Sequence, residues 1–187
     1  MSLTNVHRTF IARLDEISLH ATFIDESRSV INQITPYLDQ QSLNLNPALK
    51  NGYFSYKQTL GQVRPDDITT ALTLQGCAAF EWYLRSLVVK SAESISNKYS
   101  NYSDVPDQVL QSNIHLTGRL LSIQANAQPH DRVNTDSYCK NLGDCHSQGS
   151  SFQLNSDVFG KFSSTFDGET IENLLKRVGF NLVWDDI

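Results

Sequence analysis

Arg13 and His20 are the two residues whose types and spacing best match the cleavage of RNA without a metal ion. They stand seven residues apart in a stretch with helical periodicity, and two turns of helix bring such residues to one face. An arginine can bind a phosphate and a histidine can act as general acid or base, so the pair supplies the two functions that cleavage needs. The pattern is short and also arises by chance, so Arg13 and His20 are candidates for a catalytic pair and no more than that.

Glu81 is a third candidate, because it interrupts an apolar helical segment between Phe80 and Trp82. One interpretation places it on an exposed turn of the helix. The other makes it a partly buried carboxylate that pairs with Arg85, four residues further on, or with an arginine of a neighbouring helix. In the second case Glu81 could help to form a site.

One short segment contains two thiols and an imidazole, those of Cys139, Cys145 and His146. These groups are good zinc donors. The five-residue spacing between the cysteines is wider than the usual zinc knuckle, and His130 and Asp136 would have to complete the ligand set by loop closure. A solvated loop is the better explanation of the segment. The chain has no nucleotide-binding, zincin or hydrolase motif, and we expect no metal and no cofactor.

Composition limits the classes of protein that need to be considered. The chain has 187 residues, 40% of them hydrophobic, which suits one globular domain with its own core. No apolar run approaches the length of a membrane span, and the N-terminus lacks the apolar core of a secretory signal, so we expect a cytoplasmic protein without a membrane partner. The net charge of -5 argues against a large footprint on duplex nucleic acid and leaves room for a small local RNA site.

The element that must organise the fold is a long helix over about residues 66–95. Pro65, Asp66 and Asp67 form a helix start signal, and no proline follows within the segment. Its apolar residues cover more than one narrow stripe, which is typical of a central helix in a bundle. Cys77 lies among them, and we expect it to be a small buried side chain.

Three other segments also have helical periodicity, with apolar residues recurring at three- and four-residue intervals. The first covers residues 4–38, with a potential break at 24–27 and an end or bend at Pro36. The second covers 104–123, and the third starts near Asp167 and stops at Gly179.

Two segments lack periodicity and are predicted to be connections, namely residues 39–65 and 125–151. We expect three aromatic residues to hold the first segment onto the bundle: Tyr53, Phe54 and Tyr56. The predicted fold is therefore all-α, one bundle of four or five helices spanning residues 1–187.

Residues 71–87 carry a family resemblance, with the sequence ALTLQGCAAFEWYLRSL. This block resembles the second helix of HEPN domains, in particular the RiboL-PSP-type group, in which small and apolar residues lead into an aromatic–acid pair. Residues 155–159 and 171–180 also look like a loop and a short helix of those proteins. The resemblance covers roughly residues 69–180. It implies an all-α bundle that commonly dimerises, and many HEPN proteins are metal-independent ribonucleases of toxin–antitoxin and other defence systems.

The chain departs from the HEPN pattern where the family's catalytic motif should lie. That motif is an arginine followed four to six residues later by a histidine on the last long helix, and no arginine or histidine follows Gly179. Either the chain lacks its last helix or it is a non-catalytic relative used for binding.

Our main interpretation is a HEPN-like defence or toxin–antitoxin protein that binds RNA or protein, without a complete ribonuclease site in this chain. An active enzyme with Arg13, His20 and Glu81 at a dimer interface is one alternative. A helical interaction scaffold without a link to RNA is the other.

Overall fold

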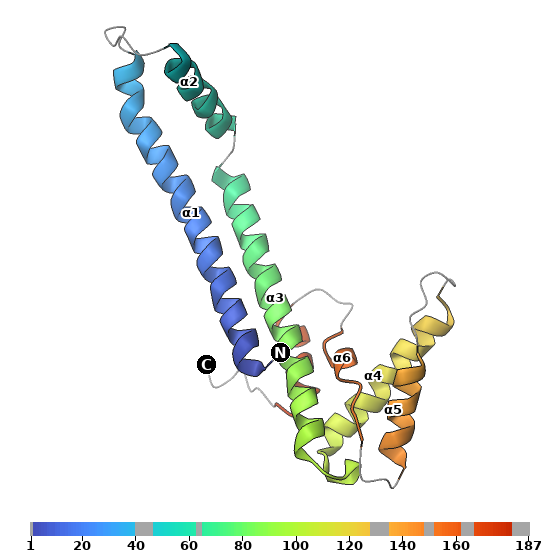
Figure 1. Ribbon diagram of the computed structural model, residues 1–187. Coiled ribbons are helices and arrows are strands. Elements are labelled where there is room, and N and C mark those ends of the chain that lie inside the picture. The colour runs from blue at the N-terminus through green and yellow to red at the C-terminus, as the bar shows by residue number, and fades with distance from the viewer. Residues whose placement is uncertain are drawn as a thin grey trace. The chain divides into compact units, whose positions relative to one another are not determined.

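The computed structural model describes residues 2–39, 47–62, 65–127, 135–147, 152–161 and 167–180. These residues form seven α-helices and one 3-10 turn and contain no β-strand, which confirms the all-α class (Figure 1). They group into two compact units, unit 1 (Met1–Arg8 and Glu81–Ile187) and unit 2 (Thr9–Phe80). The single domain over 1–187 stays a prediction. No helix in the described ranges has the length and apolar content needed to cross a membrane.

The predicted first helix forms as one uninterrupted element, α1 (Leu3–Asp39), and the suggested break at 24–27 is wrong. The polar side chains bond back into the helix: Thr22 Oγ1 donates to the carbonyl of Ser18 at 3.0 Å, and Thr35 Oγ1 to that of Ile31 at 2.7 Å. Such bonds let hydroxyl residues remain inside a helix. Pro36 lies within the last turns.

Part of the predicted connection over residues 39–65 is in fact a helix, α2 (Pro47–Gln62). The sequence did not indicate this helix because it contains asparagine and glycine, and both residues favour turns over helix. A tertiary contact supports it: the Tyr53 hydroxyl donates to the carbonyl of Ile31 at 3.2 Å and also bonds the Thr35 hydroxyl. The expected contact of Tyr53 is thus present, whereas Phe54 and Tyr56, which were expected to share its role, are exposed.

The long central helix is present as α3 (Pro65–Lys98), and its start at Pro65, Asp66 and Asp67 agrees with the prediction. In unit 2, α1 covers one side of α3, where the Phe10 and Phe80 rings lie 6.2 Å apart. Cys77 is exposed, so the expectation of a buried thiol is wrong. Leu74 is 64% exposed as well, which shows that the wide apolar surface of this half of α3 is covered only in part.

Unit 1 contains the main core, which lies between the second half of α3 and the helices α4 (Asp107–Ala125), α6 (Ser156–Phe159) and α7 (Gly168–Lys176). Its buried residues are Val88, Ala92, Val105, Val109, Leu120, Leu154, Val158, Phe159, Leu174, Leu175 and Val178. A short 3-10 turn (Tyr102–Asp104) links α3 to α4. Figure 1 shows α6 beside α4, where the two elements are in contact.

The predicted loop over 125–151 contains another helix, α5 (Asp136–His146). Its inward residues, Tyr138, Asn141 and Cys145, follow helical spacing, but two of them carry polar groups. Hydropathy therefore misses the face that packs inward. The Asn141 amide donates to the buried Asn155 side chain, as described below, and this contact helps to hold the helix in place.

The predicted boundaries of the last helix are confirmed. The Asp167 carboxylate accepts the backbone N–H of Thr170 at 2.8 Å, which caps α7, and this bond lowers the pKa of Asp167. Gly179 has φ of 84°, the left-handed conformation that ends helices. The Phe180 N–H then bonds the carbonyl of Leu175 at 3.1 Å and closes the helix end.

Candidate functional site

The structure brings Arg13 and His20 to one cavity in unit 2, as their spacing predicts. The cavity holds about 350 Å³ and is also lined by Glu16 and Ile17 of α1 and by Gln75, Ala78 and Ala79 of α3. A guanidinium, an imidazole and a carboxylate therefore surround the same space. These groups can bind a phosphate and transfer protons.

Glu81 belongs to unit 1, whereas Arg13 and His20 belong to unit 2. The Glu81 Oε1 atom accepts from Arg85 Nε at 2.9 Å and Nη2 at 2.6 Å, so the expected pairing across one helical turn is present. Both side chains are a little over one-third exposed, at 36% and 38%. The pair fixes the direction of the Arg85 side chain more than it adds stability, since such pairs contribute about 0.3–0.5 kcal/mol.

The cysteines and histidine of the proposed zinc segment lie on α5 and face different surroundings. Cys139 is exposed, whereas Cys145 is buried, donates to the carbonyl of Gln153 at 3.6 Å, and has its pKa raised by burial to about 11. A thiol with so high a pKa is a poor metal ligand or nucleophile at neutral pH.

His146 packs edge-on against Tyr102, with ring centroids 5.7 Å apart. Asp136 lies in the first turn of α5, and His130 falls outside the described residues. Across the ranges that the structure describes, no group of three histidine, cysteine or acidic residues is placed to hold a metal ion.

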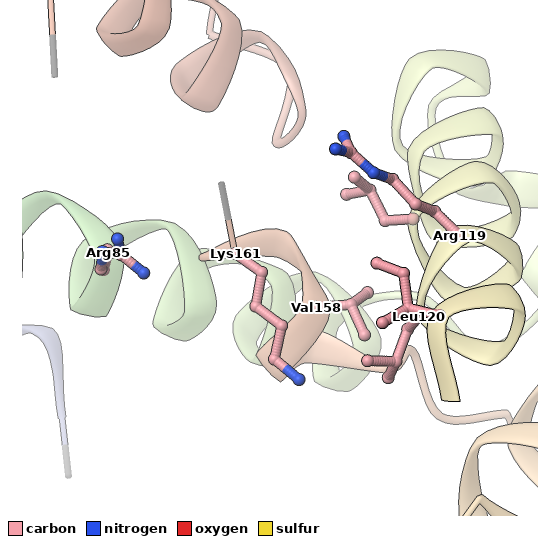
Figure 2. A pocket seen from close by; sticks show the side chains of 7 residues that line it. Arg85, Arg119, Leu120, Val158 and Lys161 are labelled. Carbon is pink, nitrogen blue, oxygen red and sulfur yellow. The ribbon is translucent and has the colours of Figure 1, made fainter. Parts of the chain in front are cut away.

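A second cavity, in unit 1, is lined by three cations over an apolar floor, and we call it the cationic pocket. It holds about 260 Å³, and its lining consists of Arg85, Leu116, Arg119, Leu120, Ile123, Val158 and Lys161. Figure 2 shows that Arg85 comes from α3, Arg119 from α4, and Lys161 from the segment after α6, with Leu120 and Val158 among them. The cavity thus concentrates positive charge in a chain whose net charge is -5.

Gly160 sets how closely this segment approaches α3. A Cβ atom at Gly160 would lie 2.9 Å from Val89 Cγ2 and 3.1 Å from the carbonyl oxygen of Arg85. Only glycine allows so close an approach without a shift of the neighbours, and it brings Lys161 next to the helix that carries Arg85.

Arg177, at the end of α7, holds the same segment from another side. Its Nη1 atom donates to the carbonyls of Phe159 at 2.8 Å and Lys161 at 2.7 Å. Burial, and after it the charge of Arg119, lowers the pKa of Arg177. A fourth cation, and the third guanidinium, therefore stands close enough to the pocket to interact electrostatically with Arg119.

A buried polar network around Asn155 positions α6 and with it the pocket wall. The Asn155 side chain donates to Thr117 Oγ1 and to the carbonyl of Tyr138, both at 3.1 Å, and accepts from Asn141 Nδ2 at 2.8 Å. Its backbone N–H donates to Asn113 Oδ1 at 3.0 Å. One buried side chain thereby ties α4, α5 and α6 together.

The α1 helix also carries an exposed apolar stripe in unit 2. Its four residues are Leu19, Phe23, Val30 and Ile34, and they are between 40% and 67% exposed. Their spacings of four, seven and four residues place them within about 60° of arc on the helix. An isolated exposed leucine is ordinary, but a continuous stripe is typical of an interaction surface.

Sequence reasoning missed the cationic pocket because Arg119 and Lys161 come from separate elements that periodicity does not bring together. The usable signal was Gly160, next to an apolar pair and a lysine, which suggests a close backbone approach.

Comparisons of the chain with family models, with curated proteins and with solved structures found no significant match.

Proposed function

We propose that this chain is a HEPN-like helical protein of a defence or toxin–antitoxin system, and that it binds RNA through the cationic pocket without cleaving it there. One observation carries the proposal: Arg85, Arg119 and Lys161 gather around one cavity of a protein that is otherwise acidic. The resemblance of residues 69–180 to HEPN domains supports the biological setting.

The chemistry of the pocket favours binding over catalysis. Arginine and lysine attract phosphate oxygens, and an arginine stays protonated at every physiological pH. The described lining contains neither a histidine nor a carboxylate, the side chains most often used to move protons. A small positive site is sufficient for local contact with RNA, even though the whole chain is negative.

Binding of a short single-stranded RNA, followed by fluorescence anisotropy, tests the proposal. We expect Arg119→Gln and Lys161→Gln each to weaken binding at least tenfold, since charge-assisted hydrogen bonds contribute roughly 1.5–3 kcal/mol. Lys140→Gln is a matched control, because Lys140 is an exposed lysine of α5 away from the pocket lining. Equal affinities for the wild type and all three variants would rule the pocket out as the RNA site.

Metal-independent RNA cleavage in unit 2 is a second candidate function, favoured by the shared cavity of Arg13, Glu16 and His20. In this mechanism Arg13 binds the scissile phosphate, while His20 removes or returns a proton. RNA incubated with the protein in the presence of a chelator measures it directly. Cleavage that disappears in both Arg13→Gln and His20→Ala but persists in Glu81→Gln supports this site; an intact substrate with the wild type refutes it.

We further propose that two copies pair through the apolar stripe on α1. The spacing of Leu19, Phe23, Val30 and Ile34 reads the same in both directions, and self-complementarity of this kind is what a two-fold interface requires. With antiparallel helices and an axis between residues 26 and 27, Leu19 lies opposite Ile34 of the second copy. Phe23 then lies opposite Val30, so every apolar residue of the stripe has an apolar partner.

Sedimentation equilibrium tests the pairing. We expect a dimer for the wild type and at least a tenfold weaker association for Phe23→Glu, because a charge would face an apolar partner. Ile11→Glu is the control, since Ile11 is also exposed on α1 but lies off the stripe. A monomeric wild type, or equal loss in both variants, would exclude the stripe as the interface.

A further inference from the structure

The cationic pocket is suited to one small anionic group and not to an extended strand. Its volume of about 260 Å³ lies near the lower end of the range for sites that take a single small ligand. The three cations come from three elements, α3, α4 and the segment after α6, and line one cavity (Figure 2). A protein that follows a nucleic-acid backbone needs a continuous positive groove.

The lining also lacks what strand-binding sites use to hold successive bases. Such sites stack bases on aromatic rings, and the described lining of the pocket contains no aromatic side chain. Its floor consists of Leu116, Leu120, Ile123 and Val158, which can contact the face of one ribose or base. The net charge of -5 further disfavours a long run of phosphate contacts.

The density of positive charge points to a ligand with more than one negative charge. Arg119 acts electrostatically on Arg177, which already uses its guanidinium to hold the backbone of Phe159 and Lys161. A ligand with two negative charges interacts more strongly with the three cations that line the cavity than a ligand with one. A phosphate monoester carries a charge of about -1.5 to -2 at pH 7, whereas each internal phosphodiester of RNA carries one negative charge.

We propose that the cationic pocket binds the phosphomonoester of a nucleotide, and that its source is the phosphorylated end of an RNA strand. Arg119 and Lys161 contact the terminal phosphate, Arg85 is held nearby by Glu81, and the apolar floor contacts the attached nucleoside. This inference rests on the proposed RNA-binding function and adds the part of the RNA that is recognised. A free nucleoside monophosphate has the same chemistry and is the other source to be tested.

Competition binding with one short RNA sequence in three forms tests the inference. The forms carry a 5′-phosphate, a 3′-phosphate or hydroxyl groups at both ends, and adenosine monophosphate and inorganic phosphate serve as free competitors. We expect at least one phosphorylated form to bind about tenfold more tightly than the hydroxyl form. Arg119→Gln and Lys161→Gln should abolish this difference, and Lys140→Gln should preserve it. Circular dichroism of each variant confirms folding, and the use of two pocket variants keeps the test valid if one of them misfolds.

The outcomes separate the two proposals. Equal binding of the phosphorylated and hydroxyl forms overturns end recognition and leaves RNA binding intact. Absence of binding to every RNA form overturns the proposed function. Adenosine monophosphate that competes as strongly as the phosphorylated RNA supports the phosphomonoester chemistry and overturns RNA as its source.

Discussion

Replacement of Gly160 by alanine tests how the pocket wall is built. The added Cβ would meet Val89 Cγ2 at 2.9 Å and the Arg85 carbonyl oxygen at 3.1 Å. Valine is stiff about its first side-chain bond and the carbonyl belongs to a long helix, so neither neighbour yields easily. Overpacking of this kind costs about 1–3 kcal/mol. Gly160 has φ of -82°, so alanine introduces no backbone strain and the whole effect is steric.

Urea denaturation measures the loss, with Gly118→Ala as the matched control. Gly118 lies inside α4, and a Cβ there meets nothing within 4 Å. Alanine should therefore stabilise that helix by about 0.5–1 kcal/mol. The two variants should shift the free energy of unfolding in opposite directions and differ by about 1.5–4 kcal/mol. A Gly160→Ala protein as stable as the wild type would refute the close approach of the segment to α3.

Three further predictions concern the polar contacts around the same wall. Asn155→Ala should lower the free energy of unfolding by about 2–4 kcal/mol, measured in urea, because Thr117, Tyr138 and Asn141 all lose a buried partner. Arg177→Met should weaken phosphate binding, measured by calorimetry, although it leaves Arg119 and Lys161 in place. The reason is that the backbone carbonyl of Lys161 loses the guanidinium that donates to it. The buried thiol of Cys145, whose pKa is raised to about 11, stabilises the fold below pH 9, and this contribution should fall as pH rises from 9 to 11; urea midpoints over that range should fall less steeply in Cys145→Ala.

The long helices were predictable because their signals are local. Apolar spacing and end signals such as the Asp167 cap and Gly179 depend on neighbours within a few residues. The same logic placed Arg13 and His20 on one face of one helix, and the structure shows both at one cavity. The α5 helix escaped prediction because its inward residues Tyr138, Asn141 and Cys145 are not aliphatic, and α2 because it contains asparagine and glycine, which favour turns.

The cationic pocket could not be predicted from the sequence, for a different physical reason. Arg85, Arg119 and Lys161 are separated along the chain by more than thirty residues at each step, and they meet only after α3, α4 and α6 have packed. That packing depends on a glycine contact and on a buried asparagine network, neither of which leaves a periodic pattern.

The salt dependence of RNA binding tests most directly whether the cationic pocket is the binding site. Each lysine or arginine that neutralises a phosphate of single-stranded RNA contributes about 0.7 to the slope of log affinity against log salt concentration. We predict a measurable slope for the wild type and a clearly smaller one for an Arg119→Gln, Lys161→Gln double variant, with Lys140→Gln unchanged. Wild-type affinity that does not vary with salt, or a double variant with the wild-type slope, would contradict the proposed site.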